Sequence, residues 1–342
     1  MTPKSRPPGQ SSRSLNASSY KYASPVIQQS VLSLLRRAFS AVYSDPETLA
    51  NTIQAVKAHL YARDYAAAFE SCDYLLAYAV RWSSSRALAY LHVLGDLCPH
   101  IRQVLTSTPN EKKNILCIGG GAGGEVLALA TLANDLRAKN VNILAVDIAH
   151  WDDVFVRLRD GIRRGLGWDK NGDGDDIAND SIQLKFTQMD ILDVPCYLEE
   201  ADVTTGLESA GDAPEPEGCN DSFNDRVDFS SLDIITILFT TNELFAQSRP
   251  RTLTLLRYIT DNCKPGTLLL VVESAGSYSH IQIGSKTFPV QFLLDHTLVD
   301  GGARWEKVVD DDAVWFRVDG AVLKYPLQLE NMRFFLRMYR RM

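Results

Sequence analysis

A short glycine-rich segment, which joins an apolar run to a helical pattern, constrains the fold of this chain most. The apolar run is Ile115–Ile118, and the turn after it carries Gly119, Gly121, Gly123 and Gly124. Glycine allows a positive φ and a close approach of the backbone to a ligand, and the first turn of a helix offers free N–H groups. The segment therefore predicts a strand, a sharp turn and a helix that together bind a cofactor.

The sequence after this turn alternates between apolar runs of strand length and segments of helix length. Such alternation predicts a parallel, doubly wound α/β sheet. The predicted strands are 115–118, 141–146, 182–186, 232–239 and 266–272, and the predicted helices are 124–137, 152–166, 248–262 and 289–298. We expect a closing β-hairpin from 304–309 and 314–318 across a turn at 310–312. A basic helix is predicted over 328–341.

The chain before the glycine turn differs in composition from the chain after it. Residues 1–25 are rich in Ser and Pro and predict a disordered tail. Residues 26–108 repeat apolar residues at helical spacing and predict a helical N-terminal layer, which includes helices at 63–82 and 84–97. Residues 109–342 form the predicted cofactor-binding domain, with an acidic insertion at about 194–230 that does not fit the alternation.

The net charge of −7 is unevenly distributed along the chain. Residues 1–44 carry six basic residues and no acid, whereas 171–233 carry 17 acids against Lys185 and Arg226. The overall acidity therefore says little about the charge of a binding site. No apolar run approaches the roughly 20 residues that a membrane span needs. Six scattered cysteines without a C-x-x-C pair argue for reduced thiols and against a zinc site.

One acidic segment, Asp169–Asp180, resembles a calcium-binding loop. Its positions 1, 3, 5 and 6 carry the expected Asp, Asn, Asp and Gly. Position 8 is Asp176 rather than an apolar residue, position 12 is Asp180 rather than Glu, and no exit helix is predicted. We therefore favour a solvated acidic loop over a calcium site. The six histidines also lack metal-ligand spacing, so no metal is expected.

The glycine turn fits two cofactor fingerprints. Gly119 and Gly121 match the dinucleotide-binding fingerprint together with Gly124. Together with Gly123 they match the S-adenosylmethionine-binding fingerprint. A glycine turn without a ligand is the third possibility. Asp147 follows a predicted strand and suits the ribose hydroxyls, and Asp190, an acid after the third strand, suits adenine N6 and favours S-adenosylmethionine. Helices before the sheet and a closing hairpin after it are common in methyltransferases, so we favour S-adenosylmethionine over a nicotinamide.

Several segments resemble a known family. The glycine turn resembles motif I of class I methyltransferases. The segments Leu238–Phe245, Val271–Ser279 and Lys324–Arg340 are similar to the fungal S-adenosylmethionine-dependent methyltransferases that include the yeast large-subunit ribosomal RNA uridine-N3 methyltransferase. The resemblance covers about residues 26–342. It implies a Rossmann-like class I methyltransferase sheet and an enzyme that methylates N3 of one uridine in large-subunit ribosomal RNA.

The resemblance also assigns a cofactor site by position. The methionine part of S-adenosyl-L-methionine would lie against Gly119, Gly121 and Gly123. Its ribose would lie against Asp147, and its adenine end against Asp190 and Ile191. Two departures from the family pattern matter. Cys117 stands where motif I often holds an acid, so that Glu125 takes this role or none does. The loop Thr240–Glu243 replaces an N/D-P-P-Y box.

Two polar residues in that loop are the candidate catalytic groups. Asn242 and Glu243 follow the predicted strand 232–239, at the carboxyl edge where open α/β sheets bind ligands. Uracil N3 carries a proton that a base must remove or share. We hypothesise that Glu243 is the base or orients it, and that Asn242 hydrogen-bonds the uracil edge. The alternative is that Glu243 caps the next helix or pairs with Arg249.

Other residues are candidates for RNA contact. Tyr278 is a candidate for stacking on a base, and a packed loop tyrosine is the alternative. Arginines near both ends of the sequence are candidates for phosphate contact, and a solvated helix face is the alternative. These arginines are Arg36, Arg37, Arg333, Arg337, Arg340 and Arg341.

Three functions stay open from the sequence alone. The favoured one is an RNA base methyltransferase whose partner is ribosomal RNA or a pre-ribosome, with no membrane and no DNA expected. The others are a methyltransferase acting on protein or a small molecule, and a non-catalytic ribosome assembly factor that binds the same cofactor. We expect a nucleolar, nuclear or cytoplasmic location, and a mitochondrial one is less favoured. The sequence leaves the oligomeric state open.

Overall fold

The computed structural model describes most of the chain. The described residues are 13–14, 22–108, 111–166, 181–195, 223, 226–276, 279–283, 286–300 and 304–342. Three sequence expectations therefore fall mainly outside them: the tail 1–25, the calcium-like loop Asp169–Asp180 and the acidic insertion 194–230. Residues 22–25, at the end of the expected tail, are described, and Ala23 is fully buried there.

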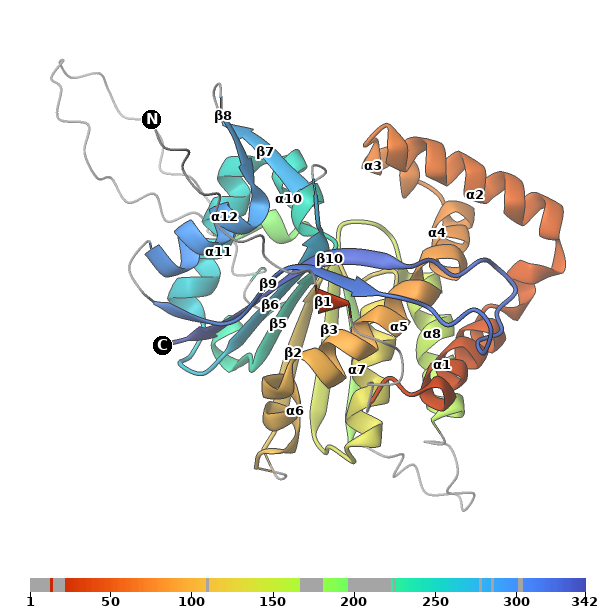
Figure 1. The fold of residues 1–342 in the computed structure, drawn as a ribbon, viewed down its shortest axis with the longest axis horizontal. Helices are drawn as coiled ribbons and strands as arrows, with labels where there is room; N and C mark the ends of the chain where they lie inside the picture. The colour runs from red at the N-terminus through yellow and green to blue at the C-terminus, as the bar shows by residue number, and fades with distance from the viewer. Residues whose placement is uncertain are drawn as a thin grey trace, which may run out of the picture.

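The fold is a mixed sheet with helices on both faces (Figure 1). The strands are β1 Arg13–Ser14, β2 Lys113–Ile118, β3 Val141–Asp147, β4 Ile182–Gln188, β5 Ile234–Leu238, β6 Leu268–Ser274, β9 Trp305–Phe316 and β10 Met332–Arg341, in the order β1-β9-β10-β6-β5-β2-β3-β4. Strands β2 to β6 pair in parallel, whereas β10 pairs antiparallel to both β6 and β9. The prediction of a mostly parallel sheet with an antiparallel C-terminal end is confirmed.

Helices precede the sheet and connect its strands. They are α1 Pro25–Ala38, α2 Pro46–Tyr61, α3 Tyr65–Ala68, α4 Cys72–Tyr78, α5 Ser84–His92, α6 Pro99–Thr106, α7 Gly124–Asp135, α8 Asp152–Gly165, α10 Thr241–Gln247, α11 Arg249–Asn262 and α12 Val290–Asp295. A separate hairpin pairs β7 His280–Ile283 with β8 Lys286–Pro289. The predicted helix 63–82 is divided into α3, α4 and a π-turn, because Ser71 caps a new helix start.

The N-terminal helices share one core with one face of the sheet. Leu32 and Leu35 of α1, Leu88 of α5 and Leu158 of α8 belong to a single cluster that includes residues of β2 and β3. Helices α10, α11 and α12 form a second cluster against the other face. The helical layer is therefore packed on the sheet itself, and its position relative to the strand ends is set by this shared core.

The C-terminal part corrects two sequence predictions. Residues 305–316 form one continuous strand rather than a hairpin, and 332–341 form strand β10 rather than a basic helix. The acidic triplet that suggested a turn lies opposite Arg337, which pairs with Asp310 and Asp312. Cross-strand charge pairing of this kind offsets the low strand propensity of aspartate. Arg337 and Leu336 lie in an interior strand, so burial overrides the helix propensity of this segment.

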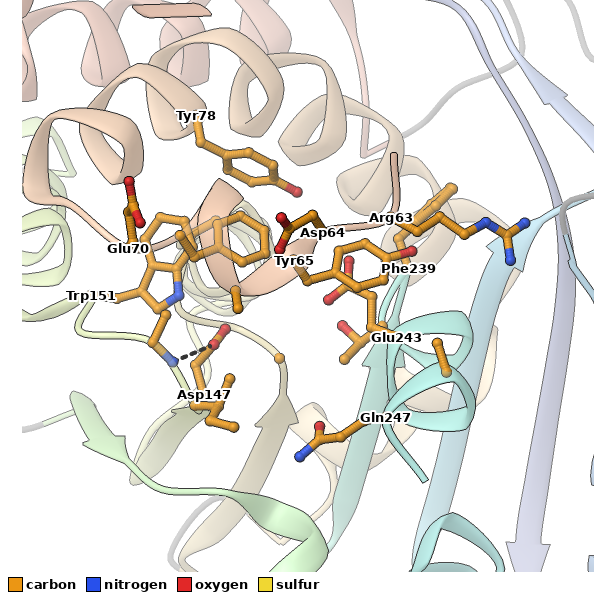
Figure 2. Close-up of a pocket in the computed structure, with 18 of the residues that line it drawn as sticks. Arg63, Asp64, Tyr65, Glu70, Tyr78, Asp147, Trp151, Phe239, Glu243 and Gln247 are labelled. Atoms are coloured by element: carbon orange, nitrogen blue, oxygen red, sulfur yellow. Dashed lines mark hydrogen bonds between the residues drawn. The ribbon is translucent and has the colours of Figure 1, made fainter. Parts of the chain in front are cut away.

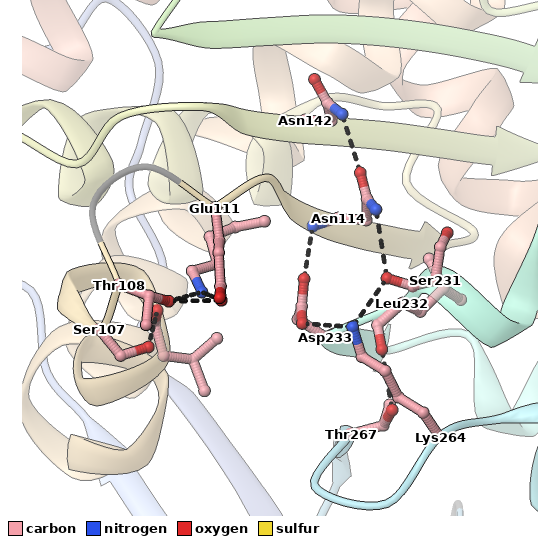
Figure 3. A network of polar contacts seen from close by, with 12 residues as sticks. Ser107, Thr108, Glu111, Asn114, Asn142, Ser231, Leu232, Asp233, Lys264 and Thr267 are labelled. Atoms are coloured by element: carbon pink, nitrogen blue, oxygen red, sulfur yellow. Dashed lines mark hydrogen bonds and ion pairs between the residues drawn. The ribbon is translucent and has the colours of Figure 1, made fainter.

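A polar network holds the amino ends of the central strands together (Figure 3). Asp233, just before β5, accepts a hydrogen bond from the Asn114 backbone N–H of β2 at 2.8 Å and pairs with Lys264 at 2.8 Å. The Asn142 amide of β3 donates to the Asn114 side chain at 2.8 Å. Three parallel strands are thus aligned at this end, and their carboxyl ends emerge together at the opposite edge.

Candidate active site

A cavity of about 590 Å³ lies between the carboxyl edge of the sheet and the N-terminal helices (Figure 2). We call its two sides the sheet edge and the helical wall. The sheet edge comprises Gly119, Asp147, Thr240 and Glu243, and the helical wall comprises Arg63, Tyr65, Phe69, Tyr78 and Arg86. Figure 2 shows Tyr65 and Tyr78 on the opposite side of the cavity from Asp147. The cavity is thus completed by residues that lie far before the glycine turn in sequence.

The glycines of the turn are required by the packing around them. Gly119 has a φ of 74°, and a Cβ there would lie 2.2 Å from Thr240 Oγ1. A Cβ on Gly121 would lie 2.0 Å from the Trp151 ring, and one on Gly123, whose φ is 77°, would lie 2.1 Å from Leu158. Only Gly119 of these three lines the main cavity.

Asp147 ends strand β3 and lines the cavity beside the glycine turn. Its carboxylate accepts hydrogen bonds from the backbone N–H groups of Gly121 at 3.1 Å and Ala149 at 3.2 Å. Burial raises its pKa, and these backbone donors act in the opposite direction. The turn and the strand end therefore hold this carboxylate at the cavity surface.

A narrow recess adjoins the main cavity past Asp147 and is lined by Asp190 and Ile191 together with apolar residues such as Met189. The Asp190 carboxylate caps a short 3₁₀ turn through the Leu192 N–H at 2.9 Å, and it accepts from Gln247 at 2.7 Å and pairs with Arg251 at 3.2 Å. Asp190 thus lies at the expected place, while both of its oxygens already have partners within the chain.

A second small recess lies on the other side of the turn, between Gly123, Glu125 and Arg86. Glu125 is buried, and among the described residues its Oε1 has no hydrogen-bond partner. Burial raises its pKa to about 8, although the neighbouring Thr236 hydroxyl and Cys117 thiol lower it. The Glu125 carboxyl therefore lies next to Cys117, the position at which motif I often has an acid.

Glu243 lies in the first turn of α10, and its carboxylate faces the cavity (Figure 2). Its side chain makes no hydrogen bond to any described residue, and Arg249 donates instead to the Gln282 carbonyl. Burial raises the pKa of Glu243 to about 8; nearby Arg86 lowers it, and Asp147 and Glu273 raise it. Glu243 therefore neither caps the next helix nor pairs with Arg249.

Asn242 occupies a different place from its neighbour. Its side-chain amide donates to Ser279 Oγ at 3.1 Å, and its backbone N–H donates to Glu273 at 3.1 Å. It does not line the cavity. The structure brings together Glu243, Asp147 and the glycine turn, but it directs Asn242 towards the loop after β6.

The helical wall packs against aromatic residues from the loops after β3 and β5, and sequence reasoning missed this aromatic lining of the cavity. The rings of Phe69, Tyr78 and Trp151 pack with centroids 5.1 to 5.7 Å apart. The Arg86 guanidinium lies 5.4 Å from the ring centroids of Tyr78 and Phe239, and it donates to the Tyr78 hydroxyl. No motif marks these residues, because they are drawn from α3, α4, α5 and the loops after β3 and β5.

Phe239 is strained at the end of strand β5. Its φ of 57° is unusual for a bulky residue, and its N–H donates to the Val272 carbonyl at 2.7 Å. Such conformations cost about 1–3 kcal/mol and are found mainly where function requires them. Here the strained residue directs its ring to the cavity and precedes the turn of helix that carries Glu243.

Two of the four arginines of β10 pair with acidic side chains, whereas Arg333 is exposed and lies over the Trp315 ring. Arg337 is 3% exposed and pairs with Asp310, Asp312 and Asp295, and Arg340 pairs with Glu306. The hypothesis that this segment presents a helix face to phosphate is therefore wrong for these two residues. Tyr278 lies outside the described residues. Arg36 and Arg37 are exposed in the last turn of α1.

The described part of the chain holds neither a metal-ligating cluster nor a membrane-spanning helix. Its histidine, cysteine and acidic side chains form no group of three or more that could hold a metal ion. None of its helices is long and apolar enough to span a membrane. Its four cysteines, Cys72, Cys98, Cys117 and Cys263, are free thiols.

The parallel sheet with its antiparallel C-terminal end, and the cavity where the glycine turn meets the acid that ends β3, define a class I methyltransferase. The chain belongs to a family described as "Putative SAM-dependent methyltransferase", which matches residues 35–340. It is also 38% identical over 321 residues to the 25S rRNA (uridine(2843)-N(3))-methyltransferase of Saccharomyces cerevisiae, with 86% of this chain and 79% of the yeast protein covered.

Solved structures of methyltransferases are similar at lower levels. A SAM-dependent methyltransferase from Methanosarcina mazei has a TM-score of 0.37 and 14% identity, covering 71% of this chain and 97% of its own. The N-methyltransferase NodS from Bradyrhizobium japonicum has a TM-score of 0.35 and 13% identity, covering 71% and 92%. Similarities of this size carry no information on the substrate.

The residues of the cavity fit S-adenosyl-L-methionine, the cofactor of this family. Gly119 brings the backbone to the cavity surface, and Asp147 presents a carboxylate at the strand end. The unpartnered oxygen of Glu125 is a buried acceptor that suits an ammonium group. The protein is therefore a SAM-dependent methyltransferase whose site has both the shape and the donor set for its cofactor.

Proposed function

We propose that this protein methylates N3 of a uridine in large-subunit ribosomal RNA. The observation that carries this proposal is the Glu243 carboxylate, which has no hydrogen-bond partner among the described residues and faces an aromatic cavity beside the glycine turn. The 38% identity to a yeast 25S rRNA uridine-N3 methyltransferase supports the same substrate class. A flat base suits a cavity lined by Tyr65, Tyr78 and Phe239.

The proposal gives each part of the cavity a role. S-adenosyl-L-methionine supplies an activated methyl group. Asp147 binds the ribose hydroxyls, Asp190 and Ile191 lie at the adenine end, and Gly119 to Gly123 lie along the methionine part, where Glu125 accepts from the ammonium group. Glu243 then takes the N3 proton of a base that has been flipped out of its stack.

The pKa of Glu243 suits this role. A general base works best when its pKa lies near the working pH, and burial places the carboxyl at about 8. The aromatic residues around the cavity exclude water from the uracil. Correct positioning of N3 in line with the methyl carbon supplies a large part of the rate. Asn242 has no role in this scheme, since its amide is held by Ser279.

The test is nucleoside mass spectrometry of ribosomal RNA from cells with and without the gene, combined with methylation of unmodified transcripts by the purified protein. We expect the N3-methyluridine signal to fall in the deletion strain and to be restored by wild-type protein but not by Glu243→Gln. An unchanged signal would contradict the proposal. Cofactor binding without transfer to any RNA would favour an assembly factor, and transfer to protein or a small molecule would favour another methyltransferase class.

A further inference from the structure

We propose that the Arg86 guanidinium binds the C4 carbonyl oxygen of the target base and stabilises the base in its N3-deprotonated form, so that Arg86 selects uracil over cytosine. This inference deepens the proposed function and depends on it. It assigns a catalytic and specificity-determining role to a residue of helix α5, outside the glycine turn and the loop after β5.

The surroundings of Arg86 are unusual for a buried cation. Arg86 is only partly exposed, lines both the main cavity and the recess of Glu125, and lies between the rings of Tyr78 and Phe239. Its only hydrogen bond to a described residue goes to the neutral Tyr78 hydroxyl. No carboxylate of the described residues lies within 4 Å of its nitrogens, so it has no ion-pair partner there.

A second arginine of the same chain shows what a structural role looks like. Arg337 is 3% exposed and contacts three carboxylates, those of Asp295, Asp310 and Asp312. A guanidinium stays protonated in proteins, and its removal from water must be offset by nearby negative charge or hydrogen bonds. Arg337 finds this charge within the fold, whereas Arg86 keeps most of its five N–H donors available to a ligand in the cavity.

The chemistry of uracil supplies an acceptor for these donors and, after loss of a proton, a negative charge. N3–H lies between two carbonyl groups, and loss of its proton spreads the negative charge over both oxygens. The N3 lone pair then forms the new bond to the methyl carbon, while the bond from that carbon to sulfur breaks and its electron pair stays on sulfur. The N3 proton passes to the Glu243 carboxylate. A guanidinium at a carbonyl oxygen stabilises the charge that develops in this step.

The same arrangement disfavours cytosine. Cytosine N3 carries no proton, and one of its neighbours is an amino group rather than a carbonyl. An amino donor facing the donors of Arg86 leaves both groups without an acceptor in a site that excludes water. Mismatches of this kind reject a competing substrate strongly, because buried polar groups are left unpaired.

The experiment compares two transcripts of the organism's large-subunit ribosomal RNA, one with uridine and one with 5-fluorouridine throughout. Fluorine makes N3 more acidic, so the fluorinated base needs less help in losing its proton. We expect Arg86→Gln to lower the rate on the uridine transcript by about 100- to 1,000-fold. On the fluorinated transcript, we expect the loss relative to wild type to be at least tenfold smaller.

The matched control is Arg63→Gln, which removes another guanidinium of the helical wall, one that is exposed at the mouth of the cavity. We expect its loss to be the same on both transcripts. Equal losses on both transcripts for Arg86→Gln, with S-adenosylhomocysteine affinity and melting temperature unchanged, would overturn the inference. A wild-type protein that methylates no uridine would instead refute the proposed function, which is a distinguishable outcome.

A second measurement covers the case in which Arg86→Gln does not fold. Arg86→Lys keeps the charge but loses the planar fork, and it serves in its place. Fluorine NMR of the 5-fluorouridine RNA, bound with S-adenosylhomocysteine, reports ionisation of the base directly. We expect the apparent pKa of the bound base to be lower with wild-type protein than with Arg86→Lys, and an equal value would count against the inference.

Discussion

The sheet edge and the helical wall of the cavity are built from different parts of the chain and are packed to different degrees. On the sheet edge, a backbone N–H group holds the Asp147 carboxylate, and Thr240 packs so closely against Gly119 that a Cβ there would not fit. Arg63 of the helical wall is exposed, and Tyr65 is only partly buried at the start of the four-residue helix α3. Under the proposed function, the closely packed side binds the cofactor and the more exposed side receives the substrate.

The largest expected effect concerns the one sheet-edge residue that faces the substrate. Glu243→Gln removes the proton acceptor and should lower the rate of methyl transfer by about 100- to 10,000-fold, with S-adenosylhomocysteine affinity changed less than about threefold. The measurements are single-turnover kinetics and calorimetry. Wild-type activity should rise as the pH rises towards about 8, because the carboxylate form is the active one, and the variant should lose this dependence.

Asn242→Ala is the matched control for this variant, because Asn242 is its neighbour in α10 and its amide is bound to Ser279. We expect less than about a tenfold change in rate. A loss as large as that of Glu243→Gln would show that Asn242 acts at the base after all, and the division of roles within this turn of helix would then be wrong.

The next effect tests the cofactor side alone. Asp147→Asn replaces a charged acceptor by an amide, and hydrogen bonds to charged groups contribute about 1.5–3 kcal/mol. S-adenosylhomocysteine affinity should therefore fall by roughly 10- to 100-fold by calorimetry, while RNA affinity is unchanged. Asp190→Asn should have a smaller effect, since the Asp190 carboxylate already pairs with the Arg251 guanidinium within the chain. The reverse order would contradict the geometry described.

A wall variant should show the opposite selectivity. Tyr65→Ala removes a ring that lines the cavity, and base stacking contributes about 1–3 kcal/mol. The kcat/KM for RNA should fall by about 5- to 100-fold, with cofactor affinity retained. Tyr61→Ala, which alters a 90% exposed ring at the end of α2, is the control and should change neither quantity. A Tyr65 variant that loses cofactor affinity would break the distinction between the two sides.

The smallest effect is on stability. Burial raises the pKa of Glu125 to about 8, above its unfolded value of about 4.5. The folded state then holds a proton that the unfolded state has lost, so the free energy of unfolding should decrease as the pH rises from about 5 to about 8. Urea unfolding of Glu125→Gln should show a decrease between pH 6 and pH 8 that is smaller than that of wild type by about 2 kcal/mol. A slope equal to that of wild type would show that Glu125 stays ionised.

The sequence allowed the central sheet to be predicted, because its strands are short apolar runs that follow a repeated order. The glycine turn and Asp147 were also predictable, since both are adjacent to strand ends and depend on local chain geometry. The C-terminal end was mispredicted because the interaction that decides its fold joins residues far apart in sequence. Arg337 and Asp310 pair across β9 and β10, and the local sequence of neither strand indicates a strand by itself. Cross-strand compensation of this kind is not visible in a local window.

The substrate side of the site was missed for a related reason. Arg86, Tyr78 and Phe239 meet only in three dimensions, and each looks like an ordinary helix or strand-end residue in sequence. Asn242 and Glu243 show the same limit, because residues one position apart in a helix point in different directions. The sequence indicated the correct loop and could not indicate which of the two side chains enters the cavity.

The order of the two sides along the chain has an evolutionary consequence. The helical wall is encoded wholly before β2, whereas the glycine turn, Asp147 and Glu243 follow it. Substitutions or insertions near α3 can therefore accumulate without disturbing the parts that hold S-adenosyl-L-methionine. Under the proposed function, substitutions in the codons for residues 63–86 would change the methyl acceptor of a duplicated gene while the methyl donor stays the same.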